Sequence, residues 1–150
     1  MIEIDLSIKD SDIKDLRKMD ENVRKGLLKG VRNAMFYAER EAKGSFGQVG
    51  RLKVRTGTLR RSIQSGAEET KDGVRGWIGA SVVYAAIHEL GGTIRPRAAK
   101  YLHFDIDGDR KTVKEVDIPA RPYLRPSIED NLDEIRDIII SSVMSEIGDK

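Results

Sequence analysis

The chain has 150 residues, of which 39% are hydrophobic and 35% are charged, with a formal net charge of +2. This length predicts one domain, residues 1–150, that buries a core without a disulfide or structural metal. The sequence has no cysteine, which excludes disulfides, thiolate metal sites and a cysteine nucleophile and fits a reducing cytoplasm. The longest apolar stretch is too short to span a bilayer, so no membrane association is expected.

The N-terminal part of the chain predicts a strand followed by a long helix. Hydrophobic and polar residues alternate over Ile2–Ile8, which is the period of a strand with one buried face. Over Ile13–Ala42 the hydrophobic residues recur at steps of three and four, as on a helix with one apolar side. Gly26 and Gly30 lie close to that side. A helical glycine costs ~1 kcal/mol relative to alanine, so we expect this helix to pack closely on a sheet there.

Glycines interrupt the chain after this helix. The segment Gly44–Thr58 has no periodicity and predicts a long, basic, mobile loop, of a kind that is often functional in small domains. One helical turn is expected over Thr58–Ile63. A hairpin follows, with strands over Ala67–Thr70 and Val74–Ala80, because the Asp-Gly pair between them favours a tight turn.

The C-terminal half predicts a helix over Val82–Leu90 that ends at two glycines. Strands over Tyr101–Asp105 and Val113–Ile118 are expected to flank a turn near Asp107-Gly108. The segment Pro119–Pro126 holds three of the four prolines and predicts a stiff connector with Tyr123 and Leu124 packed inward and its arginines facing outward.

The last helix is expected to begin at Pro126, since proline is well suited to a first helical position. Its predicted apolar face consists of Ile128, Leu132, Ile135, Ile139 and Val143. The sum is an α+β fold, because strands and helices do not alternate as βαβ units. It has a long N-terminal helix and a C-terminal helix packed on a mostly antiparallel sheet of about four or five strands, with a long basic loop.

The sequence offers no constellation of catalytic or metal-binding residues. His88-Glu89 begins a zinc motif of the form H-E-x-x-H, but the position of the second histidine is Gly92. Neither a phosphate-binding G-x-x-x-x-G-K-[ST] loop nor a G-x-S-x-G nucleophile turn is present. We therefore expect a protein that is not an enzyme, with no catalytic residue, no bound cofactor and no metal.

Charge is segregated along the chain, and the charged residues are the candidates for interaction. No acid interrupts the segment Lys43–Arg61, here called the basic segment. Its arginines and lysines, interleaved with glycine, would suit a DNA-binding accessory protein that tracks phosphates, although Phe46 is its one aromatic residue. The alternative is contact with a protein surface of opposite charge. The candidate residues are Lys43, Arg51, Lys53, Arg55, Arg60 and Arg61 in the basic segment, Arg121 and Arg125 in the proline segment, and an acidic cluster of Glu129, Asp130, Asp133 and Glu134.

Four sequence motifs occur in an order that resembles a known family. They lie in Val54–Ile63, Val83–Gly92, Ala99–Phe104 and Ile118–Pro126. The first, second and fourth correspond to the family patterns R-T-G-x-L-R-x-S-I, Y-A-x-x-H/E-x-G and P-A-R-P-F/Y-L-R-P. The chain resembles the phage neck and tail-completion proteins, a group that includes virion-morphogenesis and head–tail joining proteins of siphophages and Mu-like phages. The match covers roughly Val54–Asp130, while the N-terminal half is similar only in its strand and long helix.

This resemblance implies a structural role in the neck or tail of a virion, reached by assembly in the host cytoplasm. It implies a ring of identical subunits, with a hexamer favoured and a dodecamer possible, and neighbours of two kinds: a head-completion or connector protein, and a tail terminator or tail tube protein. Contact with DNA in the channel is possible. Because a ring needs two different, complementary surfaces on each copy, we expect the basic segment to meet the acidic cluster of a neighbour.

Overall fold

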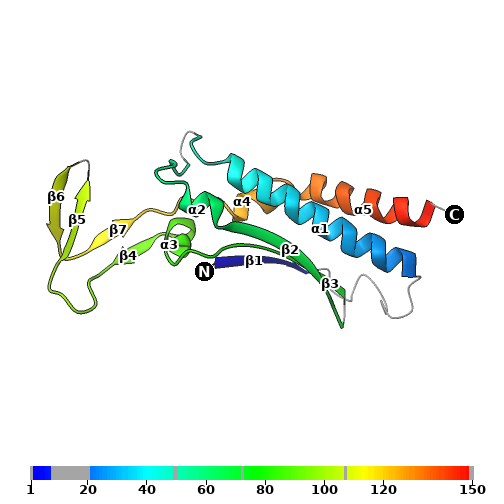
Figure 1. Cartoon of the computed structure of the whole chain (residues 1–150), viewed down its shortest axis with the longest axis horizontal. Helices are drawn as coiled ribbons and strands as arrows, with labels where there is room; N and C mark the ends of the chain where they lie inside the picture. The colour runs from blue at the N-terminus through cyan, green and yellow to red at the C-terminus, as the bar shows by residue number, and fades with distance from the viewer. Residues whose placement is uncertain (1, 8–20, 49–50, 72, 107, 149–150) are drawn as a thin grey trace.

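The computed structural model of the protein describes residues 2–7, 21–48, 51–71, 73–106 and 108–148. The long helix α1 (Glu21–Gly44) lies between a sheet and the C-terminal helix α5 (Leu132–Gly148), as Figure 1 shows. The start of the predicted first helix, residues 13–20, lies outside the described part. No helix in the described part of the chain is long and apolar enough to cross a bilayer.

The main sheet has three antiparallel strands in the order β1-β3-β2. These are β1 (Ile2–Ser7), β2 (Ile63–Thr70) and β3 (Gly73–Ala80), and the central strand β3 pairs with both others at Ala80. The alternation at the N-terminus and the Asp-Gly turn therefore predicted their strands correctly. Gly76 of β3 lets α1 approach the sheet, because a Cβ atom there would stand 2.8 Å from side-chain atoms of Val31 and Met35.

The two helical glycines face a different partner from the one expected. A Cβ atom on Gly26 would stand 2.8 Å from the Cα of Val143, and one on Gly30 would stand 2.9 Å from the Cα of Ile139. Both contacts are with the backbone of α5, so close packing is confirmed but the prediction of a sheet partner was wrong. Helical periodicity shows which side of a helix is apolar, whereas it does not show which element covers that side.

The short helices lie near the centre of the molecule. The predicted helical turn is α2 (Thr58–Arg61), and the predicted second helix is the shorter α3 (Ala85–Leu90). Gly91 follows α3 with a positive φ of 72° and ψ of 179°, a conformation that glycine adopts without strain. The described part of Gly44–Thr58 folds back on the body: the backbone N–H of Gly47 donates to the carbonyl of Leu52 at 2.8 Å, and Leu52 is buried.

Residues Gly92–Ile118, here called the arm, extend from one end of the body (Figure 1). Near the body, β4 (Gly92–Ile94) pairs with β7 (Val116–Ile118). Beyond them, β5 (Leu102–Ile106) pairs with β6 (Asp109–Val113). The expected pairing of Tyr101–Asp105 with Val113–Ile118 was wrong, because the tight turn pairs Ile106 directly with Asp109 and leaves β7 free to pair with β4.

The α+β class is confirmed, but the strands are divided among three sheets. One sheet has three strands, and the two in the arm have two strands each. The C-terminal helix covers α1 and not the sheet itself. Alternation in a sequence identifies individual strands, whereas the number of strands in a sheet depends on distant pairings that alternation does not encode.

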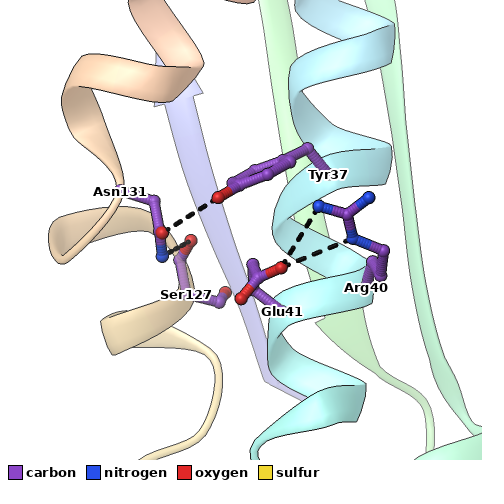
Figure 2. Close-up of polar contacts among 5 residues, drawn as sticks. All are labelled: Tyr37, Arg40, Glu41, Ser127 and Asn131. Carbon is purple, nitrogen blue, oxygen red and sulfur yellow. Dashed lines mark hydrogen bonds and ion pairs between the residues drawn. The ribbon is translucent and has the colours of Figure 1, made fainter.

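The predicted last helix is two helices, α4 (Arg125–Glu129) and α5. Asn131 lies between them and is held on both sides: its Oδ1 accepts from the Tyr37 hydroxyl of α1 at 3.2 Å, and its Nδ2 donates to the carbonyl of Ser127 at 3.2 Å, as Figure 2 shows. The break rotates the helical face. Ile128 and Ile135 are buried as predicted, while Leu132 is 49% exposed.

Candidate subunit interface

A buried carboxylate joins α3 to the proline segment. The side chain of Glu89 is 3% exposed. Its Oε2 accepts the backbone N–H groups of Tyr123 and Leu124 at 2.7 and 2.9 Å, and its Oε1 accepts that of Arg125 at 2.9 Å. The first N–H groups of a helix lack partners within the helix, and no side chain of the segment itself caps α4. Glu89 therefore fixes the segment from outside, and a negative charge at this helix end is favourable.

The proline segment has the orientation that the sequence predicts. Tyr123 and Leu124 are buried, while Arg121 and Arg125 are exposed. The Tyr123 ring packs edge-on against Phe46 with 5.3 Å between centroids, and burial raises the pKa of the Tyr123 phenol. The segment also bonds to α3 through the Arg121 N–H and the His88 carbonyl at 2.8 Å. The two arginines thus project from a backbone that is held at several points.

Next to this junction lies an open hollow of about 400 Å³. Its apolar lining comes from the basic segment and from the residue just before α3, and consists of Phe46, Leu52, Val54, Leu59 and Tyr84. Lys53, Arg55 and Arg60 line it as well, together with His88. Burial, with the nearby charge of Arg121, lowers the pKa of His88 below its usual value. The hollow is therefore an apolar depression beside several fixed positive charges.

The predicted basic residues divide into two groups. Three of them form a hydrogen bond or an ion pair within the chain: Lys43 pairs with Glu39 at 2.6 Å, Arg51 donates to the Pro122 carbonyl at 2.7 Å, and Arg60 donates to the Lys43 carbonyl at 3.0 Å. The exposed Arg61 side chain packs close to Gly57. Lys53 and Arg55 are exposed and make no ion pair with any described residue. These two cations are the members of the basic segment most available to a partner.

The acidic cluster lies at the junction of α4 and α5. All four of its carboxylates are exposed. The Oε1 of Glu129 is 4.0 Å from the Nε of Arg125, and the Oδ1 of Asp133 is 3.6 Å from the Nη1 of Arg136. Asp130 lines a small hollow of about 150 Å³ that Arg51 lines too. Arg51, in the middle of the basic segment, therefore lies near the acidic cluster within a single chain, although the two regions are far apart in sequence.

Sequence reasoning missed the role of Glu89. The residue was considered only as part of a failed zinc motif, whereas its carboxylate accepts three backbone N–H groups. A signal was present, because Tyr123-Leu124-Arg125 is a run of three N–H donors between two prolines, and such a buried run needs acceptors. The sequence does not indicate which acid supplies them.

Comparison with known proteins agrees with this arrangement of motifs. The search of curated proteins and the search of solved structures gave no significant match. A profile of the phage virion morphogenesis family matches residues 35–144. The matched range begins in the second half of α1 and includes the hollow, the Glu89 junction, the arm and most of α5. The chain belongs to the phage virion morphogenesis family.

Proposed function

We propose that this chain is a non-enzymatic structural subunit of a tailed-phage virion, and that identical copies form a ring at the head–tail junction. The observation that carries this proposal is the exposed pair Lys53 and Arg55 beside an apolar hollow, with an exposed acidic cluster on another part of the same chain. A closed ring is built from contacts between unlike surfaces, and the chain offers surfaces of opposite charge.

The neighbours along the tail axis follow from the same proposal. A head-completion or connector protein lies on one side of the ring, and a tail terminator or tail tube protein lies on the other. A hexamer is the favoured ring, with a dodecamer as the larger alternative. Opposite charges set the orientation of approaching subunits and speed their encounter more than they add affinity.

The experiment reverses the two available cations, with Lys53→Glu and Arg55→Glu in one variant. Arg60 is left unchanged because it bonds to the end of α1. The mass of the wild type and the variant is measured by light scattering over a range of salt concentrations. We expect wild-type assemblies that weaken toward 1 M salt, where the Debye length falls to ~3 Å, and a variant that stays folded and monomeric. Lys71→Glu is the control, since Lys71 is exposed and lies at the far end of the β2–β3 hairpin. Normal assembly by the double variant would contradict the proposal.

DNA binding by the basic segment is the second candidate, and the same exposed cations support it. Phe46, however, packs on Tyr123, so this ring is engaged inside the protein and is not free to stack on bases. A gel-shift titration with duplex DNA separates the two candidates. Protein assembly requires no DNA, whereas DNA binding would give a shift that the Lys53→Glu, Arg55→Glu variant loses in proportion to the phosphate contacts removed.

A further inference from the structure

The arm ends in a hairpin that the body does not cover, and one of its faces carries four apolar side chains. The register of β5 and β6 places Leu102, Phe104, Ile106 and Val113 on this face, with Lys111 and Asp109 opposite Phe104 and Ile106. His103 and Asp105 lie on the other face with Thr112 and Arg110. In Figure 1 this hairpin stands at the end of the molecule opposite to α5. A two-stranded hairpin alone is at best marginally stable in water, so an apolar face of this kind calls for a cover.

We propose that the tip of the arm of one subunit inserts into the hollow of a neighbouring subunit. This inference rests on the proposed self-assembly and names the arm tip, in place of the acidic cluster, as the partner of Lys53 and Arg55. Ile106, which is 48% exposed, is the side chain that enters the apolar hollow. Asp105 and Asp109, on either side of the turn, meet Lys53 and Arg55 beside it.

Charge decides between the hollow and another exposed apolar surface, the outward face of α5. Between Asp105 and Asp109 the sequence has three aspartates and no base, while Arg110 and Lys111 stand behind the tip. The outward face of α5 also exposes apolar side chains, including Ile140, Met144 and Ile147. That helix carries more acids than bases, so it repels an acidic tip, whereas the hollow attracts it. The ion pair of Asp109 with Lys111 is long, at 3.6 Å, and exposed, so it exchanges readily for a new partner.

The geometry of one chain requires the hollow to belong to another copy. The arm follows α3, which lines the hollow through His88, with Tyr84 just before the helix. It then extends away, so its tip lies far from α2 and α3 of its own chain (Figure 1). Tip and hollow are therefore two different surfaces at separate places on one subunit. Repeated contact between them produces a ring when the rotation closes.

The test uses the absence of cysteine from the chain. Ile106→Cys and Val54→Cys are made as separate full-length variants, because Val54 lines the hollow and is 48% exposed. The reduced proteins are first measured by light scattering, then mixed in equal amounts and oxidised. We expect a disulfide-linked dimer in the mixture and at least tenfold less in either variant alone. A chain carrying both substitutions should give a ladder of linked multimers.

A control mixture of cysteine variants distinguishes an incorrect arm contact from an absence of self-assembly. Ile106→Cys is mixed with Ile147→Cys, which places the second thiol on the outward face of α5. If the reduced proteins assemble but the Val54 mixture forms no more disulfide than the Ile147 mixture, the arm contact is overturned and the ring stands. If the reduced proteins are monomeric at every concentration and neither mixture crosslinks, both the arm contact and the proposed self-assembly are overturned.

Discussion

The body and the arm use the same kinds of residue in opposite ways. In the body, Glu89 is buried and accepts three N–H groups, and Leu124 is fully buried beside it. In the arm, Glu115 forms an exposed pair with Arg95, and Ile106 is about half exposed at the tip. Buried charge and apolar side chains stabilise the body from inside, whereas these two arm residues are exposed. The arm is therefore organised for contact with something outside the subunit, and its residues are expected to contribute little to subunit stability.

The largest contrast is expected between the two glutamates. Glu89→Ala removes the acceptor of three backbone N–H groups, and each buried donor left without a partner costs about 1–3 kcal/mol. We expect the free energy of unfolding in urea to fall by roughly 3–6 kcal/mol. Glu89→Gln keeps one acceptor oxygen, so its free energy of unfolding should lie between those of the wild type and Glu89→Ala. Glu115→Ala removes an exposed ion pair, so its effect is expected within ~0–1 kcal/mol. Equal losses for Glu89→Ala and Glu115→Ala would show that Glu89 does not hold the proline segment.

A smaller contrast is expected between two aliphatic residues. Leu124 is fully buried, and its truncation to alanine leaves a cavity that costs about 2–5 kcal/mol. Ile106→Ala is expected to change the free energy of unfolding of the monomer by no more than about 0.5 kcal/mol, as at most surface positions. Urea denaturation of both variants, at a concentration where the wild type is monomeric, gives the comparison. A loss at Ile106 as large as that at Leu124 would mean that the arm is part of the core.

The body also shows what the sequence could predict and what it could not. Periodicity located the strand at Ile2 and the helical face with Val31 and Met35, because alternation and 3.6-residue repeats are local properties. The proline segment was predicted with its inward and outward residues. The predicted packing partner of Gly30 and the predicted pairing partner of β7 were wrong, because both depend on which distant element of the chain lies nearby. Glu89 was missed for the same reason: its three N–H partners are more than thirty residues away in the chain.

The smallest effect is expected at the boundary between body and arm, where His88 lies in α3. Burial first, and the charge of Arg121 second, lower the pKa of His88 below its usual value. Protonation of His88 is therefore less favourable in the folded than in the unfolded protein. Above pH ~6.5 the residue is neutral in both states and does not lower the free energy of unfolding. As the pH falls from there to the pKa of the folded state, protonation of the unfolded state progressively lowers the free energy of unfolding. His88→Gln removes this titration. Between pH 7.5 and pH 5.5 we expect the melting temperature of the wild type to fall further than that of His88→Gln. The variant lacks the His88 titration, and the other titratable groups are the same in both proteins. His103→Gln is the control in the arm, where the imidazole is exposed and bonds to Thr112, and it should keep the wild-type difference. If His88→Gln and the wild type respond alike, the environment of His88 does not penalise its charge, and the hollow beside it is more open to water than its apolar lining indicates.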